Sequence, residues 1–289
     1  MRTLRYVLLD VFTDRPLTGN PLAVFTDGRG LDATLMQRLA RELNLSESVF
    51  VLPAEASGHA RLRIFTPATE LPFAGHPTLG AAFVLGGPLQ SELVRLETGS
   101  GVVPVRLERE GATVVFGWMK QPIPAFRPFT ATEELFGALG VKESALPVVE
   151  ADNGARHVLV VVADADTVAG LTPDFAQLAQ LVEAGIHVSA PSGDGSYRAR
   201  SFAPALGVPE DPATGSAAGP LAVHLACHGR LGFGDVLRIE QGVELDRPST
   251  LFAVARGTAD KIENVEVGGA ATVIGRGELQ LKLVQLVTR

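Results

Sequence analysis

The chain has 289 residues, of which 46% are hydrophobic and 20% charged, and its formal net charge is −7. This composition excludes a disordered chain, and the negative charge argues against nucleic acid and anionic membranes as partners. The length suits two domains of about 145 residues, each with its own core.

The first ten residues contain no apolar run long enough for a signal peptide. No stretch approaches the roughly 18 uninterrupted apolar residues that cross a membrane. We therefore expect a cytoplasmic protein without membrane contact. Cys227 is the only cysteine, which excludes an intrachain disulfide, a cysteine-rich zinc site and a pair of catalytic thiols.

Short strands dominate the first half. Apolar runs predict them over residues 6–12, 22–25, 48–52, 61–65, 101–107 and 113–118. An amphipathic helix is predicted over 33–43, because Leu35, Leu39 and Leu43 share one face and Asp32 can cap its start. The proline-rich segment 121–128 is the expected connector to the second half.

The second half is predicted to be built in the same way. Its strands are expected over residues 157–162, 185–190, 198–202, 236–240, 250–255 and 263–267. Pro173, at a first helical position, predicts a helix over 172–181. A final strand is expected over 279–287, on either half.

Two stretches of the chain resemble each other. Arg61-Leu-Arg-Ile-Phe-Thr-Pro67 returns as Arg198-Ala-Arg-Ser-Phe-Ala-Pro204, and Thr78 further along matches Thr214. Each stretch leads into a helix that is apolar almost all round, over 79–85 and 215–227, and such helices are usually buried. We expect two related α+β halves, each a curled sheet around one buried helix, with a ligand cleft between them.

The first candidate for chemistry is Glu47, which stands between Ser46 and Ser48 where a helix gives way to an apolar strand. Apolar neighbours raise the pKa of a carboxyl toward neutrality, which suits a general acid/base. The alternative is a solvated glutamate in a turn, since most acidic side chains are exposed.

Further candidates lie in the polar turns that precede the two apolar helices. His76 stands at a helix entrance, where backbone N–H groups favour anions and an imidazole can exchange a proton. In the second turn, Asp211 is followed by donors that suit a carboxylate, namely Thr214, Gly215 and Ser216. The alternative is that the polar side chains of both turns only cap the helices.

Metal and nucleotide signatures are weak in this sequence. His224 and His228 have the spacing of a metal pair, but no glutamate follows His224 as in a zinc protease. A nucleophile elbow, a dinucleotide fingerprint and a Walker loop are lacking. We expect no metal and no cofactor.

Four motifs occur in one order: Thr18-Gly-Asn20-Pro21-Leu-Ala-Val24, Asn44-Leu-Ser-Glu47-Ser, Arg63-Ile-Phe-Thr-Pro-Ala-Thr-Glu70-Leu-Pro-Phe-Ala-Gly-His76-Pro-Thr and Glu210-Asp211-Pro-Ala-Thr-Gly-Ser216-Ala-Ala. Together they resemble the PhzF-like phenazine-biosynthesis isomerase family over nearly the whole chain. The resemblance implies the diaminopimelate-epimerase fold. This is an α+β fold of two pseudosymmetric domains, each a curled mixed or antiparallel sheet wrapped around a central buried helix.

The resemblance also implies the site. Glu47 is the acid/base residue, and His76 and Asp211 complete the catalytic set. The substrate-binding residues are Asn20, Ser46, Gly75, Thr214, Gly215 and Ser216. Epimerases of this fold use one cysteine per domain, and the matching turns here contain no thiol, which excludes epimerisation by two cysteines.

We expect half-domains over 1–122 and 123–289, and the resemblance implies a homodimer. The predicted function is that of a cofactor-independent isomerase, which moves a proton within a small carboxylic acid similar to dihydro-hydroxyanthranilate. One alternative is an amino-acid racemase or epimerase with a single carboxylate base. The other is a non-catalytic protein that binds a small ligand.

Overall fold

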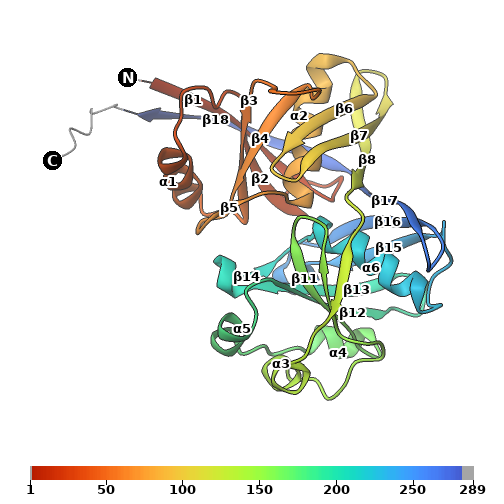
Figure 1. Cartoon of the computed structure of the whole chain (residues 1–289). Helices are drawn as coiled ribbons and strands as arrows, with labels where there is room; N and C mark the ends of the chain where they lie inside the picture. Colours follow the sequence, from red (N-terminus) through yellow and green to blue (C-terminus); the bar gives the residue numbers. More distant parts are fainter. Residues whose placement is uncertain (1, 282–289) are drawn as a thin grey trace.

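The computed structural model describes residues 2–281 and consists of two lobes, one above the other in Figure 1. The elements up to the connection between the lobes are β1 (Arg2–Val11), β2 (Asn20–Phe25), α1 (Ala33–Leu43), β3 (Glu47–Leu52), β4 (Ala60–Phe65), β5 (Glu70–Leu71), α2 (Gly75–Leu89), β6 (Leu93–Thr98), β7 (Gly101–Glu110) and β8 (Thr113–Gln121).

The elements that follow are β9 (Ala125–Pro128), α3 (Thr132–Leu139), β10 (Val149–Asp152), β11 (Arg156–Val161), α4 (Ala165–Ala169), α5 (Phe175–Leu181), β12 (Gly185–Pro191), β13 (Tyr197–Ala203), η1 (Pro204–Leu206), β14 (Val208–Asp211), α6 (Gly215–Cys227), β15 (Val236–Gln241), η2 (Val243–Leu245), β16 (Ser249–Gly257), β17 (Ile262–Gly269) and β18 (Ala271–Leu281).

The predicted α+β fold is confirmed, and each strand predicted before residue 268 overlaps an observed one. The helix expected from residue 172 begins only at Phe175, because the side chain of Asp174 accepts the first-turn N–H of Gln177. The final strand expected over 279–287 overlaps the end of β18, which begins earlier, at Ala271. Residues 282–287 lie outside the described residues.

The two lobes have the same strand order. In the first lobe, hydrogen bonds join the strands in the order β18, β1, β2, β3, β4, β6, β7, β8. Strand β8 pairs with β17, and the order continues as β16, β15, β13, β12, β11, β10, β9. Parallel pairs occupy matching places: β2–β3 and β4–β6 in one lobe, β11–β12 and β13–β15 in the other. This correspondence supports the inferred repeat.

The chain crosses between the lobes twice. After β8 it enters the second lobe as β9, which pairs with β10, and after β17 it returns as β18, which pairs with β1 (Figure 1). The described end of the chain therefore lies in the first lobe. The division at residue 122 stays a prediction.

The structure also corrects the alignment of the repeat. Helix α2 begins at Gly75 and helix α6 at Gly215, so that His76 and Ser216 are the second residues of equivalent helices. The sequence match of Thr78 with Thr214 is therefore wrong by about one helical turn. The cause is that the connections between strand and helix differ in length in the two halves.

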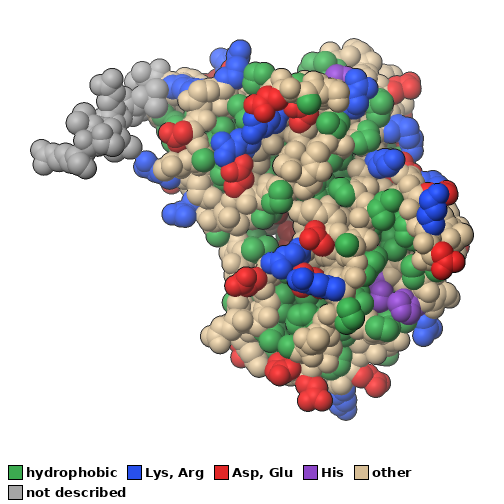
Figure 2. Space-filling model, in the orientation of Figure 1, with side chains coloured by type: hydrophobic (Ala, Val, Ile, Leu, Met, Phe, Trp, Pro, Cys, Tyr) green, Lys and Arg blue, Asp and Glu red, His purple; other side chains and the backbone are tan. Residues whose placement is uncertain are grey.

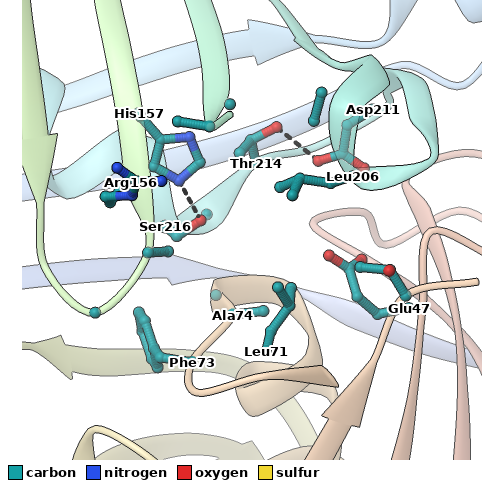
Figure 3. Close-up of a pocket in the computed structure, with 18 of the residues that line it drawn as sticks. Glu47, Leu71, Phe73, Ala74, Arg156, His157, Leu206, Asp211, Thr214 and Ser216 are labelled. Carbon is teal, nitrogen blue, oxygen red and sulfur yellow. Dashed lines mark hydrogen bonds between the residues drawn. The ribbon is translucent and has the colours of Figure 1, made fainter. Parts of the chain in front are cut away.

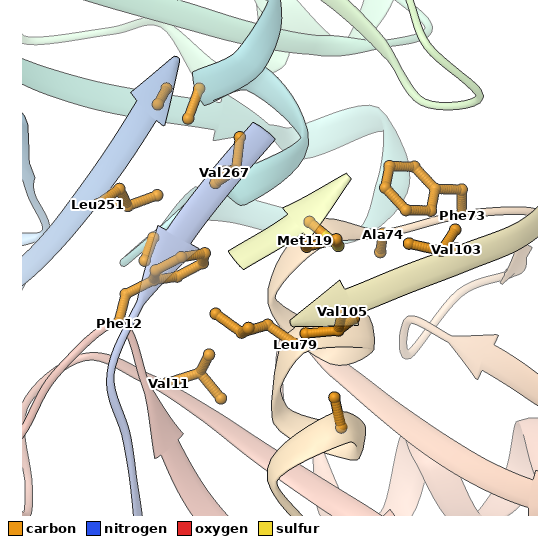
Figure 4. Packing of buried hydrophobic residues seen from close by; sticks show 14 of the residues in the cluster. Val11, Phe12, Phe73, Ala74, Leu79, Val103, Val105, Met119, Leu251 and Val267 are labelled. Carbon is orange, nitrogen blue, oxygen red and sulfur yellow. The ribbon is translucent and has the colours of Figure 1, made fainter. Parts of the chain in front are cut away.

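The central strands of each curled sheet are packed on both faces. The inner faces surround α2 and α6 in one continuous apolar cluster, whose centre contains Phe12, Leu79, Met119 and Val267 (Figure 4). Helix α1 covers the outer face of the first sheet, and helices α3, α4 and α5 cover that of the second. Two-sided burial explains why the central strands β2, β3, β11 and β12 read as apolar runs rather than as alternating patterns.

The starts of α2 and α6 touch each other. A Cβ atom on Gly75 would lie 2.5 Å from the carbonyl carbon of Gly215 and 2.5 Å from the backbone nitrogen of Ser216. Both neighbours are backbone atoms, so neither can turn aside. Glycine at position 75 is therefore required for the two helix starts to meet.

We predict that Gly75→Ala lowers the free energy of unfolding by about 1–3 kcal/mol, as overpacking does in a close-packed interior. The matched control is Gly87→Ala in the same helix. There, a Cβ atom meets no described atom within 4 Å, and alanine should be neutral or stabilising. Urea denaturation of both variants tests this, and equal stabilities would contradict it.

Candidate active site

A cavity of about 470 Å³ opens between the lobes and is lined from both of them. The space-filling view shows the molecule hollowed between the lobes, with acidic and basic side chains beside the hollow (Figure 2). Exposed side chains of Asp152, Arg156 and Glu183 are among the lining groups. Deeper in the cavity, the apolar side chains of Leu71 and Phe73 form part of the wall (Figure 3).

Glu47 lies in this cavity at the first position of β3. Helix α1 ends at Asn44, which adopts the left-handed conformation that asparagine tolerates and turns the chain toward β3. The Glu47 side chain is only 13% exposed, and its Oε2 atom has no hydrogen-bond partner among residues 2–281. Burial raises the pKa of Glu47 well above its usual range, and the Asp211 carboxylate raises it further. Glu47 is therefore not a solvated turn residue.

Asp211 approaches from the second lobe and is held by hydrogen bonds. The Asn20 amide donates to Oδ1 at 2.7 Å, and the Thr214 hydroxyl donates to Oδ2 at 2.6 Å. Burial raises the pKa of Asp211 to about 6, although hydrogen bonds from Thr214, Asn20 and Ser46 act in the opposite direction. The two carboxyls thus face the same cavity in different environments. Asp211 accepts several hydrogen bonds, whereas Oε2 of Glu47 accepts none among the described residues (Figure 3).

His76 lies between these groups as the second residue of α2. Its Nδ1 atom is 3.2 Å from the Asn20 amide nitrogen, and its Nε2 atom is 3.4 Å from Oε2 of Glu47. The orientation of the Asn20 amide is fixed, because its nitrogen also contacts two acceptors, Asp211 Oδ1 and the Ala213 carbonyl. Nδ1 of His76 thus faces a donor group and not an acceptor, so the proton of the neutral ring belongs on Nε2. Burial lowers the pKa of His76 to about 3, which keeps this ring neutral.

The alternative that these side chains only cap the helices is not supported. Among the described residues, neither N-cap residue, Ala74 for α2 or Thr214 for α6, makes a side-chain cap hydrogen bond. Thr214 instead donates to Asp211 and accepts from the Gln241 amide at 2.9 Å. Two helix starts with positive dipole ends therefore meet at the cavity beside Gly75 and Gly215.

Buried amides that the sequence did not reveal hold the start of α6. Gln121 donates to the Gly215 carbonyl at 2.8 Å, and Asn153 donates to the Ser216 carbonyl at 3.0 Å. Gln241 donates to the Asp211 carbonyl at 2.7 Å. These residues occur singly among apolar strands and loops, so no motif marks them.

One more lining residue was missed, namely His157 on β11. Its Nε2 atom is 2.8 Å from the Ser216 hydroxyl, as the left side of Figure 3 shows. The ring is 6% exposed, and burial lowers the pKa of His157 to about 4. The only signal in the sequence was a histidine at the start of a predicted strand. That signal did not distinguish a residue of the site from a residue of the core.

A metal cluster is not found in the described part of the chain, where no three His, Cys, Asp or Glu side chains are grouped to hold an ion. In the histidine pair with metal-ligand spacing, the ring of His228 is hydrogen-bonded to the backbone carbonyl of His224. Within residues 2–281, no helix is long and apolar enough to cross a bilayer.

Comparisons with known proteins agree with this architecture. A family model described as phenazine biosynthesis-like protein matches residues 9–277. The trans-2,3-dihydro-3-hydroxyanthranilate isomerase of Pseudomonas chlororaphis is 47% identical over 276 residues, which cover 96% of this chain and 99% of that protein.

Two solved structures have the same fold. The crystal structure of a Bacillus anthracis phenazine biosynthesis protein of the PhzF family has a TM-score of 0.84 and 26% identity, and the match covers 97% of this chain and 100% of the other. A predicted epimerase from Pseudomonas aeruginosa has a TM-score of 0.82 and 35% identity, with 96% and 100% covered.

The buried carboxyls predict how stability changes with pH. The pKa of Asp211 is about 6 in the folded protein, whereas the ordinary pKa of a free aspartate side chain is 3.8. Between these values the folded state binds more protons, so this group makes stability fall as pH rises. We predict that Asp211→Asn makes the melting temperature fall less between pH 4 and pH 7 than in the wild type.

Differential scanning calorimetry across this pH range measures the difference. The exposed Glu42→Gln variant removes one acidic group without touching the cavity and should follow the wild-type profile. Parallel profiles of wild type and Asp211→Asn would show that Asp211 does not titrate as described.

Proposed function

We propose that this chain, which belongs to the phenazine biosynthesis-like family and is an isomerase, moves a proton between two carbons of its substrate with Glu47 as the acid/base group. The observation that carries the proposal is the Glu47 carboxyl, which lies buried in the cavity with a raised pKa and an Oε2 atom without a hydrogen-bond partner among residues 2–281. A general acid/base works best when its pKa lies near the operating pH.

The different environments of the two carboxyls divide their roles. Asp211 accepts hydrogen bonds from Thr214 and Asn20, which favour its ionised form. Its negative charge in turn raises the pKa of Glu47, which makes the ionised Glu47 carboxylate a stronger base. Glu47 would then take a proton from one ring carbon and return it to another carbon of the same conjugated system. His76, neutral with its proton on Nε2, would stabilise negative charge on Glu47 or on the substrate.

The two helix starts provide a place for the substrate's carboxylate. The first-turn N–H groups at Gly75 and Gly215 lie beside the cavity, and both helix dipoles direct positive charge there. Ser216 adds a hydroxyl at the same point. A carboxylate bound here would lie on the side of the cavity opposite to Glu47, so that the ring of the substrate would extend toward the base (Figure 3).

The substrate we propose is trans-2,3-dihydro-3-hydroxyanthranilate or a close analogue. Support comes from the Pseudomonas chlororaphis isomerase named for this compound. The apolar wall at Leu71 and Phe73 suits a ring, and the polar groups of both lobes suit its amino, hydroxyl and carboxyl groups. Genes that neighbour this one in the genome would test the assignment.

An epimerase with two thiols is not supported. Cys227 is exposed at the last position of α6, whereas the first position of that helix lies at the cavity. A 13-residue helix separates the two points by roughly 20 Å.

We propose a cytoplasmic homodimer, the state that the family resemblance implies.

We predict that Glu47→Gln lowers kcat by about 100-fold to 10,000-fold, since removal of a general base typically has this effect. The amide keeps the size of the side chain, so the melting temperature should change little. Glu183→Gln is the matched control, because that carboxylate also lines the cavity but is exposed to water. Wild-type turnover by Glu47→Gln would show that another group is the base.

We further predict that dialysis against EDTA leaves turnover unchanged. A proton transfer between two carbons involves no change of oxidation state, and Glu47 itself supplies the acid/base group. The rate of the dialysed enzyme, with and without added Mg²⁺ or Zn²⁺, is the measurement. A rate that falls on dialysis and returns with one metal would contradict the cofactor-independent mechanism.

A further inference from the structure

The hairpin of β10 and β11 contacts Ser216 at two atoms. Pro220 lies inside α6 and has no N–H, so the carbonyl of Ser216 lacks its usual partner one turn further along the helix. Asn153, in the turn of the hairpin, donates to that carbonyl at 3.0 Å. His157, on the following strand, makes the only hydrogen bond that the described residues offer to the Ser216 hydroxyl, at 2.8 Å.

His157 has little freedom to move away from this contact. Its cross-strand neighbour on β12 is Gly185, and a Cβ atom there would overlap the imidazole ring. The ring therefore occupies the space that a side chain at position 185 would fill. Any larger residue at position 185 would displace the imidazole, so the glycine allows His157 to contact Ser216.

The position of the proton on His157 follows from its surroundings. The Nδ1 atom is buried and has no hydrogen-bond partner among residues 2–281. A buried N–H group without a partner is rarer and more costly than an unpaired acceptor, so the proton belongs on Nε2. The imidazole then donates to Ser216 Oγ. The hydroxyl proton of Ser216 is left free to point into the cavity.

The first lobe contains an equivalent contact. There, the amide nitrogen of Asn20 at the start of β2 lies 3.2 Å from Nδ1 of His76, the second residue of α2. In the second lobe, His157 near the start of β11 donates to Ser216, the second residue of α6. The strands β2 and β11 occupy the same place in the two sheets, each parallel to its neighbour. In both lobes a strand residue thus orients the second residue of the central helix.

We infer that His157 is a positioning residue that turns the Ser216 O–H toward the substrate's carboxylate. The inference rests on the proposed function only in taking a carboxylate as the group bound at the helix starts. His157 acts through Ser216 and takes no part in the proton transfer at Glu47. Its loss should therefore weaken carboxylate binding much more than it slows turnover at saturation.

The test uses the full-length protein and two probes that cannot isomerise. One is 3-hydroxyanthranilate, which carries the carboxylate on an aromatic ring, and the other is 2-aminophenol, which lacks it. Calorimetric titration should show that His157→Leu and Ser216→Ala each weaken 3-hydroxyanthranilate binding roughly fivefold, the effect of one hydrogen bond. The double variant should be no weaker than either single variant, because both remove the same interaction. Binding of 2-aminophenol should not change.

Two further variants separate positioning from a general effect on the fold. His157→Gln keeps an N–H donor and should bind 3-hydroxyanthranilate within about twofold of the wild type, given the modest energy of one hydrogen bond. His187→Leu replaces another buried histidine, on the adjacent strand β12, and should leave binding unchanged. The inference would be overturned if His157→Gln bound 3-hydroxyanthranilate as weakly as His157→Leu does. It would also be overturned if His187→Leu lost as much affinity as His157→Leu.

The outcomes also distinguish this inference from the proposed function. Protein that shows the His157-dependent binding but turns over no substrate would contradict the proposed function and support the inference. Protein that isomerises the substrate while His157→Leu binds 3-hydroxyanthranilate as tightly as the wild type would overturn the inference alone. Wild-type protein that binds neither probe would overturn both.

Discussion

The close approach of two helix starts, Gly75 of α2 against Gly215 of α6, is the contact on which the site depends. Like ends of two helix dipoles repel each other, so this arrangement needs support. Buried amides give that support by donating to first-turn carbonyls of α6, as Gln121 and Asn153 do. The carbonyls of Gly215 and Ser216 thereby have hydrogen-bond partners, while both residues line the cavity.

Much of the fold could be predicted from the sequence because its signals are local. An apolar run predicts a strand wherever it lies, and Asp32 caps α1 through an N–H only three residues away. The repeated stretches at 61–67 and 198–204 predicted two related halves, which the matching strand order supports. The residues brought together at the cavity, Glu47, His76 and Asp211, came from motifs that resemble a known family rather than from physical reasoning about single residues.

The rest depended on contacts between distant parts of the chain. Whether β18 joins the first lobe or the second is decided by its hydrogen bonds to β1, to which no local pattern points. His157 and Asn153 look like ordinary polar residues next to strands until their hydrogen bonds to Ser216, at the start of α6, are seen. The alignment of the repeat failed at Thr78 for a similar reason. It paired identical residues, Thr78 with Thr214, whereas the equivalent positions in the structure are the helix starts.

The exchange of strands between the lobes has a consequence for how the protein is made. The first lobe closes its sheet with β18, whose residues 271–281 are synthesised after nearly all of the rest. Its apolar strands β1 and β2 therefore emerge from the ribosome long before their last partner exists. Because contacts between such distant residues form slowly, the first lobe is the later one to be completed, and the unpaired edge of β1 is the place where a nascent chain is open to wrong partners.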